Sequence, residues 1–267
     1  MTAVATEPVT SASDVVPALR LRGVGRRFGG LEAVQDIDLD VLPGERRAIL
    51  GPNGAGKTTL FNVVAGDLPS TSGTVEFFGR DITLLPARRR AGLGLTRTYQ
   101  QSRLFRGLSV EDNIYLSIIG VEGGHHRPVV LPGRDGAIRA RAREAAGRVG
   151  LERKLDELVS SLSHGEHRQV ALAMALAIHP KVLMLDEPAS GLSRGERQVL
   201  SELLLALDPE ITLLVIEHDM DVALRVADKV TVLDHGRTLV AGSTAEIRRN
   251  EQVRNLYLGA DAFQGQS

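Results

Sequence analysis

The sequence predicts an α/β protein with a mostly parallel sheet, a small antiparallel sheet near the start and a helical insertion. Along most of the 267 residues, short apolar runs typical of buried strands alternate with helix-compatible stretches. The opening third differs, because its short alternating segments are split by Gly-Gly, Pro-Gly and Ser-Gly turns. The stretch from about residue 87 to residue 160 is rich in Arg and Ala and mostly helical in pattern. These three observations define the expected architecture.

The antiparallel sheet is predicted from three segments near the N-terminus. They are Leu19–Arg27, Ala33–Leu42 and Gly73–Phe78. Residues 1–17 lack the basic start and the long apolar stretch of a secretory signal, and we expect a disordered tail there. A second tail is expected over residues 259–267, which leaves one domain over residues 18–258.

The parallel sheet is predicted from short apolar runs separated by helix-compatible stretches. The runs are Ala48–Leu50, Lys181–Asp186, Thr212–His218 and Lys229–Asp234. Four apolar residues in a row before Asp186 indicate a strand that is fully buried. The helical insertion is interrupted by a loop, Gly123–Gly136.

Composition excludes several classes of function. The net charge is −1, so no global basic field points to nucleic acid, and we expect no nucleic-acid partner. The chain has no cysteine, which excludes disulfides, thiolate metal sites and cysteine nucleophiles. The longest apolar run, Val170–Ile178, is shorter than the roughly 20 residues that span a bilayer. Any membrane role is therefore expected to be peripheral and to depend on a partner chain.

Residues 51–59 read GPNGAGKTT and form the turn from a predicted strand into a predicted helix that ends near Gly66. Glycines in such a turn let backbone N–H groups approach a ligand, and the helix start adds about half a positive charge. The spacing fits the P-loop, whose lysine reaches the β- and γ-phosphates and whose next hydroxyl ligates Mg²⁺. A glycine-rich turn that binds nothing is the alternative. The nucleoside triphosphate site is predicted to comprise Gly51, Pro52, Asn53, Gly54, Ala55, Gly56, Lys57, Thr58 and Thr59.

Two carboxylates follow the buried run Val182–Leu185. Ligands of open α/β sheets bind at the carboxyl ends of the strands. Asp186 is predicted to hold the metal shell of a phosphate-bound Mg²⁺, and Glu187 to polarise an attacking water. In isolation, this pattern is as typical of a strand that meets a helix cap; beside a P-loop, the functional interpretation is favoured.

A third motif, Leu162-Ser163-His164-Gly165-Glu166, opens a helical run. Ser163 can cap this helix, which leaves the helix N–H groups and dipole aimed at an anion. A cap with no ligand is the alternative. With the P-loop before it and a strand ending in Asp-Glu after it, the order of motifs resembles the nucleotide-binding subunits of ATP-binding cassette (ABC) transporters. The resemblance covers about residues 18–258.

The resemblance implies ATP and Mg²⁺ as cofactors and a head-to-tail dimer in which each chain supplies half of each site. Ser163 and Gly165 would then contact the γ-phosphate held by the other subunit. His218 would contact the γ-phosphate and orient the catalytic group Glu187 and its water, beside Lys57. Hydrolysis would reopen the dimer, and the helical insertion would pass this motion to membrane partners.

Two further positions match residues with known roles in the family. Gln100 matches the glutamine that senses Mg²⁺, as ligand and catalytic group, and links the core to the helical insertion; Gln101 is the competing assignment. Phe28 matches the aromatic residue that stacks on adenine, although a core role is also possible.

Three residues depart from the family pattern. His164 and Glu166 stand where the family has a glycine and the glutamine, and Ser193 stands where the loop after the catalytic carboxylate commonly has aspartate. None of these changes removes a phosphate or metal ligand. They leave open how strongly the chain dimerises and how the two sites communicate.

A run of arginines without acidic residues between them lies in the helical insertion. It comprises Arg88, Arg89, Arg90, Arg97, Arg103 and Arg106. A nucleic-acid patch is conceivable, but a solvated or partner-facing surface is favoured because aromatic interleaving is missing. In the family this region meets the membrane subunits, and Leu104, Phe105 and Leu108 are candidates for apolar anchors or for core.

Within the family, three stretches resemble the ATPase subunits of branched-chain amino acid importers. They are Gly94–Phe105, Ile216–Met220 and Val253–Gly259. The ATPase subunits of urea and amide importers share these sequence features, and a lipid-export ATPase such as the lipopolysaccharide-export subunit is the alternative. A non-transport soluble ABC ATPase or a P-loop kinase fits less well. The resemblance implies membrane-spanning permease subunits, a second ATPase subunit (this chain or a paralogue), an indirect solute-binding protein and a place at the cytoplasmic face of the membrane.

Overall fold

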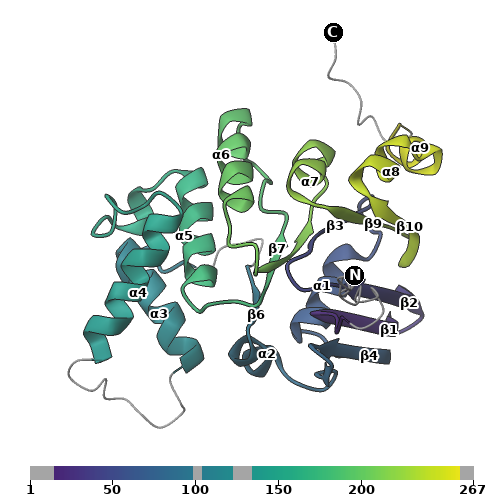
Figure 1. The fold of residues 1–267 in the computed structure, drawn as a ribbon, viewed down its shortest axis with the longest axis horizontal. Helices are drawn as coiled ribbons and strands as arrows, with labels where there is room; N and C mark the ends of the chain where they lie inside the picture. The colour runs from purple at the N-terminus through teal and green to yellow at the C-terminus, as the bar shows by residue number, and fades with distance from the viewer. Residues whose placement is uncertain (1–14, 99–103, 123–133, 259–267) are drawn as a thin grey trace, which may run out of the picture.

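The computed structural model describes residues 15–98, 104–122 and 134–258. Their strands form two sheets with a cluster of helices beside them (Figure 1). The four-stranded sheet has the order β2-β1-β4-β5 and is antiparallel throughout. Its strands are β1 (Leu19–Phe28), β2 (Leu31–Val41), β4 (Ser72–Phe77) and β5 (Arg80–Asp81). The antiparallel sheet predicted from the sequence is thus confirmed, with the short β5 added at its edge.

The six-stranded sheet has the order β10-β9-β3-β8-β7-β6, and only β10 runs antiparallel to its neighbour. Its strands are β3 (Arg46–Leu50), β6 (Leu95–Arg97), β7 (Val182–Asp186), β8 (Thr212–Ile216), β9 (Lys229–Asp234) and β10 (Arg237–Ser243). The predicted parallel sheet is confirmed. The strand predicted over Thr212–His218 ends two residues earlier, so Glu217 and His218 lie beyond it.

The parallel sheet is buried on both faces, and its residues alternate between two cores. Leu183 and Leu185 of β7 face one apolar cluster, whereas Val182 and Met184 face the other. This alternation follows from the period of two along a strand. Continuous apolar runs are therefore required in these strands, because neither face meets water.

Helices complete both cores. They are α1 (Lys57–Ala65), α2 (Ala87–Leu93), α3 (Val110–Glu122), α4 (Arg134–Arg148), the 3₁₀ turn η1 (Val159–Ser161), α5 (His164–Leu176), α6 (Arg194–Leu205), α7 (Met220–Val226), α8 (Thr244–Arg249) and α9 (Glu251–Leu258). Helix α1 lies between the two sheets, and α6 to α9 cover the opposite face of the parallel sheet (Figure 1).

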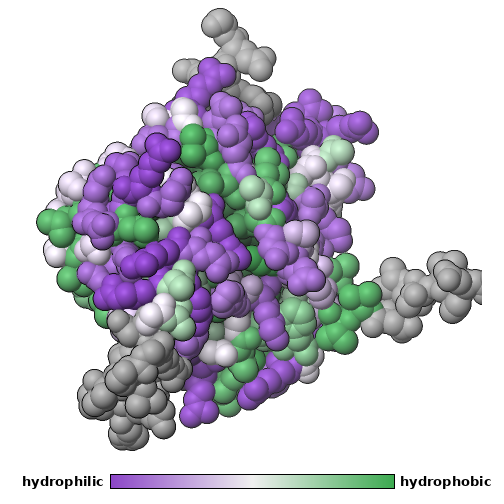
Figure 2. All heavy atoms as spheres, turned by 60° about the vertical axis from the view of Figure 1, so that its left-hand side comes forward, coloured by the Kyte–Doolittle hydropathy of each residue, from purple (hydrophilic) through white to green (hydrophobic). Residues whose placement is uncertain are grey.

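The stretch predicted as a helical insertion contains α3 and α4. Both helices contact α5, which follows in the chain. The predicted stretch is not helical throughout, because β6 pairs with β7 in the main sheet. Three strand residues between Gly94 and Thr98 are too few to show a pattern in the sequence. The surface over the helical side is mostly polar, with apolar side chains in several separate places (Figure 2). Within the described ranges, no helix combines the length and the apolarity that crossing a bilayer requires.

Candidate nucleotide site

The P-loop joins the end of β3 to the start of α1, as predicted. Two of its glycines are required by close backbone contacts. A Cβ atom on Gly51 would lie 2.3 Å from the carbonyl oxygen of Leu233, and one on Gly56 would lie 2.3 Å from that of Ala33. Gly56 also has a φ of 94°, which side-chain-bearing residues rarely adopt. The loop therefore packs closely between Leu233 of β9 and Ala33 of β2, and a side chain at either glycine would not fit.

A cavity of about 510 Å³ opens over this loop, within the usual size of a ligand site. The predicted residues Asn53–Thr59 form one wall. Phe28, Glu187 and His235 contribute to the others. The structure thus brings the P-loop, the aromatic residue and the second carboxylate together, although they lie far apart in the sequence.

Lys57 is almost fully buried at the base of the loop. Its Nζ donates hydrogen bonds to the carbonyl oxygens of Gly51 (2.6 Å) and Pro52 (3.0 Å). Burial lowers the pKa of the Lys57 amine, while the nearby charges of Glu187 and Asp186 act in the opposite direction. The ammonium is thereby held against the loop backbone, where a bound polyphosphate would offer it a stronger acceptor.

Asp186 ends β7 and is 2% exposed. Its Oδ2 accepts a hydrogen bond of 2.6 Å from Nη2 of Arg97, whereas its Oδ1 has no hydrogen-bond partner among the described residues. Burial raises the pKa of the Asp186 carboxyl, and the Arg97 guanidinium opposes this shift. The buried Asp186 oxygen without a partner and the hydroxyl of Thr58, which lines the cavity, both have the donor chemistry that Mg²⁺ prefers. These residues therefore fit a magnesium ion.

Glu187 follows directly and adopts an unusual backbone conformation. Its φ is 46°, in the left-handed region that a branched or long side chain enters at a cost. The amide of Glu187 donates to the carbonyl oxygen of Ile216 on the neighbouring strand (3.0 Å), which holds the bend in place. The bend turns the chain away from the strand direction and leaves Glu187 at the cavity wall.

His218 lies in the bend after β8, and the register of β7 and β8 pairs Asp186 with Ile216. The histidine therefore follows the strand beside the one that carries Glu187. Its side chain is exposed and does not line the cavity. Glu217, between Ile216 and His218, is fully buried and accepts a hydrogen bond from the amide of Ala189 (2.9 Å). This bond links the loop after Glu187 to the end of β8.

Ser163 and Gly165 lie elsewhere. They line a separate groove of about 500 Å³ between the starts of α5 and α6. Ser163 caps α5, because its Oγ accepts the amide of Glu166 (3.2 Å) and Glu166 Oε2 accepts the amide of Ser163 (2.8 Å). Within one chain, this motif and the P-loop cavity do not meet.

The departures from the family pattern at 166 and 193 have a structural explanation. Both residues belong to capping boxes: Glu166 closes the box of α5, and Ser193 forms the box of α6 with Glu196. Hydrogen bonds from Ser193 lower the pKa of the Glu196 carboxyl. The backbone amide of Gly165 also donates to this carboxylate and lowers its pKa to a smaller extent. The carboxylates of Glu166 and Glu196 therefore stabilise the starts of α5 and α6.

Phe28 is 42% exposed, lines the cavity and has the guanidinium of Arg26 at 4.5 Å from its ring centre. The alternative of a core role is therefore not supported. Gln100 and its competitor Gln101 lie outside the described residues, so the structure places neither of them.

The arginine run divides into exposed and buried members. Arg88, Arg89 and Arg106 are exposed, and Arg103 lies outside the described residues. The expectation of a surface role is wrong for the other two: Arg90 is 2% exposed, and the side chain of Arg97 is 8% exposed. Burial of an arginine depends on acceptors from distant segments, which the local sequence does not reveal.

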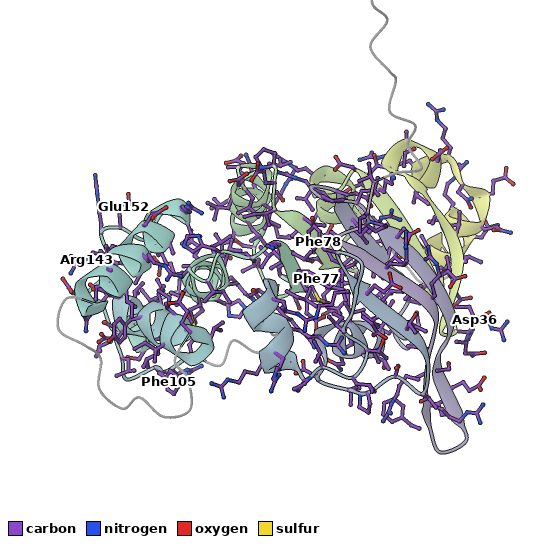
Figure 3. All side chains as sticks on the ribbon, turned by 60° about the horizontal axis from the view of Figure 1, so that its bottom comes forward. Asp36, Phe77, Phe78, Phe105, Arg143 and Glu152 are labelled. Carbon is purple, nitrogen blue, oxygen red and sulfur yellow. The ribbon has the colours of Figure 1, made fainter. Side chains whose placement is uncertain are left out.

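The three apolar candidates nearby also divide. Leu104 packs against the larger apolar core, and Leu108 is half-buried. Phe105 is 56% exposed, at the lower edge of the helical region and apart from Phe77 and Phe78 of the antiparallel sheet (Figure 3).

Sequence reasoning missed several residues of the site, among them Arg97 and His235. Arg97 holds Asp186, and His235 lies in the β9–β10 turn that covers the P-loop, where the Gly236 amide donates to the carbonyl oxygen of Ala55 (3.0 Å). The only sequence signal for the turn is the His-Gly pair after a predicted strand.

A P-loop together with a strand of the same sheet that ends in two carboxylates, here Asp186 and Glu187, defines a P-loop nucleoside triphosphatase. The chain also matches the family model described as ABC transporter over residues 34–190, which is more than half of its length. It is similar to the high-affinity branched-chain amino acid transport ATP-binding protein LivG of Escherichia coli (strain K12), with 35% identity over 250 residues that cover 91% of this chain and 98% of that protein. The chain belongs to the ABC transporter family, as an ATP-binding subunit and ATPase.

Solved structures agree with this assignment. The ADP conformation of MJ1267, an ATP-binding cassette of an ABC transporter, is 27% identical, with a TM-score of 0.81 and coverage of 91% of this chain and 99% of that chain. The dimeric structure of MJ0796, a bacterial ABC transporter cassette, is 25% identical, with a TM-score of 0.72 and coverage of 85% and 98%. The predicted cassette fold, with its antiparallel sheet and helical region, is confirmed.

Proposed function

We propose that two ATPase subunits close head to tail around two Mg-ATP, each pairing its P-loop cavity with the start of α5 of the other, and that this motion powers an importer of branched-chain amino acids. The observation that carries the proposal is the separation of the two halves within one chain. Ser163 and Gly165 line a groove of their own, so they can meet a γ-phosphate only on another subunit. The dimeric neighbour MJ0796 supports this arrangement.

In this proposal, the P-loop amides and Lys57 bind the phosphates, and Phe28 stacks on the adenine. Thr58, Asp186 and Gln100 would hold Mg²⁺, which supplies charge neutralisation at the phosphates when bound. Glu187 accepts the proton of the attacking water, for which its place at the cavity wall suits it. His218 stabilises the charge that develops on the γ-phosphate.

The cargo is inferred from LivG, a branched-chain amino acid transport protein similar to this chain over nearly its whole length. The permease subunits would contact the helical region, where Phe105 is exposed, and a solute-binding protein would act through them. The chain would then sit peripherally at the cytoplasmic face of the membrane. Uptake of labelled leucine, isoleucine and valine, compared between cells carrying the wild-type chain and cells carrying Lys57→Ala, tests the cargo; equal uptake would refute it.

The dimer is tested by light scattering of Glu187→Gln with and without Mg-ATP, beside the wild-type chain. We expect the variant to dimerise only with ATP and to hydrolyse it slowly, because the nucleotide stays bound when the base is removed. A variant that binds ATP yet stays monomeric would exclude a homodimer and point to a paralogue as the second subunit. A variant that hydrolyses ATP at the wild-type rate would exclude Glu187 as the base.

A further inference from the structure

The guanidinium of Arg97 joins the metal-binding strand to the helix that follows the P-loop. Nη2 donates to Oδ2 of Asp186 at 2.6 Å, at the end of β7. Nη1 donates to Oδ2 of Asp67 at 3.0 Å and to Oδ1 of Asn62, at the end of α1. One side chain thus contacts both β7 and α1. The start of α1 and the residue after β7, Glu187, line the nucleotide cavity.

This contact is enclosed in the protein. The Arg97 side chain is 8% exposed and that of Asp186 is 2% exposed. The planar guanidinium has its donors in a fixed fork, so it fixes the direction of the acceptor and not only its charge. A lysine at this position could neutralise Asp186, but it could not hold three acceptors on two elements in one plane.

The pairing with Arg97 also gives the two carboxylate oxygens of Asp186 different environments. Oδ2 is occupied by Arg97, whereas Oδ1 has no hydrogen-bond partner among the described residues. Buried carboxylate oxygens normally have a partner, so this one calls for an explanation. A cation bound beside the phosphates would supply the missing partner.

We propose that Arg97 is a positioning residue for the metal of Mg-ATP: it holds Asp186 by one oxygen and presents the other to Mg²⁺. Through Asn62, the same guanidinium is anchored to α1, which carries Thr58 in its first turn. Two of the groups proposed to hold the ion, Asp186 and Thr58, are therefore positioned relative to the same guanidinium, Asp186 directly and Thr58 through α1. This inference rests on the proposed role of Asp186.

The opposite role is physically reasonable and gives the test its direction. A cation that neutralises Asp186 also repels Mg²⁺, so Arg97 could be a counter-ion that the metal must displace. In that case, removal of Arg97 would strengthen the binding of Mg²⁺. Positioning predicts the reverse, because residues that orient metal ligands typically contribute about 10- to 100-fold to metal affinity.

The experiment measures binding of a fluorescent ATP analogue to the full chain, first with EDTA and then across a magnesium titration. For Arg97→Met, we expect the Mg²⁺ concentration at half-maximal effect to rise about 10- to 100-fold. Affinity for the metal-free nucleotide should stay within about threefold of wild type, since the P-loop contacts are intact. A loss of equal size with and without metal would mean that Arg97 only supports the fold, and tighter Mg²⁺ binding would mean that it is a counter-ion; either result overturns the proposal.

Arg90→Met is the matched control. Arg90 of α2 is another buried arginine; its Nη1 donates to the carbonyl oxygens of Val63 (2.9 Å) and Val64 (2.6 Å) at the end of α1, and its guanidinium forms no ion pair with a carboxylate of the described residues. We expect this variant to be less stable, with an unchanged magnesium requirement. If Arg97→Met does not fold, Asn62→Ala removes one anchor of the guanidinium and should raise the magnesium requirement severalfold; no change there would also refute the proposal.

Asp186→Asn separates this inference from the proposed function. If Asp186→Asn leaves the magnesium requirement unchanged, the proposed metal site is wrong and the role of Arg97 falls with it. If Asp186→Asn raises the requirement and Arg97→Met does not, the metal site stands and only the role of Arg97 is refuted.

Discussion

At the P-loop, the charged side chains are buried, and Asp186 is bound to a distant part of the chain, whereas at the start of α5 the polar and charged side chains are exposed or half-exposed and bonded mostly within their own helix. Lys57 and Asp186 are 5% and 2% exposed, and their partners come from the loop backbone and from β6. Ser163 is exposed, and Glu166 bonds to it three residues away. The nucleotide side is therefore organised by the core, and the α5 side mainly by its local cap.

This difference suggests a division of labour. A site whose groups are fixed by burial can bind its ligand in a single chain, because the ordering was completed on folding. A capped helix start on the surface offers few contacts of its own and gains a ligand only when another surface brings it. Variants on the two sides should accordingly differ in size and kind of effect.

The largest effect is expected for Lys57→Ala on the nucleotide side. Hydrogen bonds to charged groups contribute about 1.5–3 kcal/mol each, so loss of the ammonium should weaken ATP binding about 100-fold or more. Isothermal titration calorimetry measures this change. Lys154→Ala, near α5, is the control and should alter ATP binding by the isolated chain less than about twofold. Similar losses in both variants would contradict the comparison.

Glycine substitutions should separate the two sides by stability. Gly56→Ala places a Cβ 2.3 Å from the carbonyl oxygen of Ala33, at a φ of 94°. Strain of about 2–3 kcal/mol should lower the Tm by about 5–10 °C in a thermal melt. In Gly165→Ala the closest atom is Glu196 Oε1, at 2.7 Å, on a side chain that can move. Its Tm should stay within about 2 °C of wild type, helped by the helix propensity of alanine; a large fall would show that the α5 start is also fixed by packing.

A smaller effect, limited to alkaline pH, is expected behind the P-loop. Tyr257 of α9 lies beside Gly51, and burial raises its pKa to about 12 from the ordinary 10.0. Because the folded state holds this proton more tightly, its contribution to stability is complete below pH 10 and is lost as the pH rises through 12. Tyr257→Phe removes this titration, and at pH 11 the wild type should have lost about 1 kcal/mol that the variant keeps. Denaturant unfolding at pH 8 and pH 11 measures it; parallel losses in both proteins would place the titrating group elsewhere.

The smallest effect concerns the negative charge that Glu166 introduces at the start of α5. Lys154 Nζ lies 2.8 Å from Glu166 Oε1, and this hydrogen bond is the main cause that lowers the pKa of the Glu166 carboxyl. We expect Lys154→Met to raise the ATP concentration that dimerises Glu187→Gln by about two- to fivefold, as for exposed ion pairs. In a chain that also carries Glu166→Gln, the change should vanish, because no charge is left to neutralise. An equal change in both backgrounds, measured by light scattering, would refute this electrostatic role.

Much of the fold followed from local pattern. The buried strands β7 and β8 were visible as continuous apolar runs, and Ser163 was predicted as a helix cap. The missed strands lack such a pattern: β6 has three residues, and β10 is exposed or half-exposed along its whole length, without a buried face. Edge strands of this kind form because a neighbouring strand provides backbone hydrogen-bond partners, and their own residues show little strand preference.

The sequence by itself determined the P-loop and the helix caps. Their hydrogen bonds and backbone angles involve residues a few positions apart, so the spacing of glycines, Lys57 and Ser163 is sufficient to specify them. Only the tertiary structure decided that Arg97 holds Asp186 across 89 positions, that the turn with His235 covers the loop, and that Ser163 lies on another surface. The order of strands in the sheet sets those contacts, because β6 and β7 become neighbours only when the chain between them has folded away to one side.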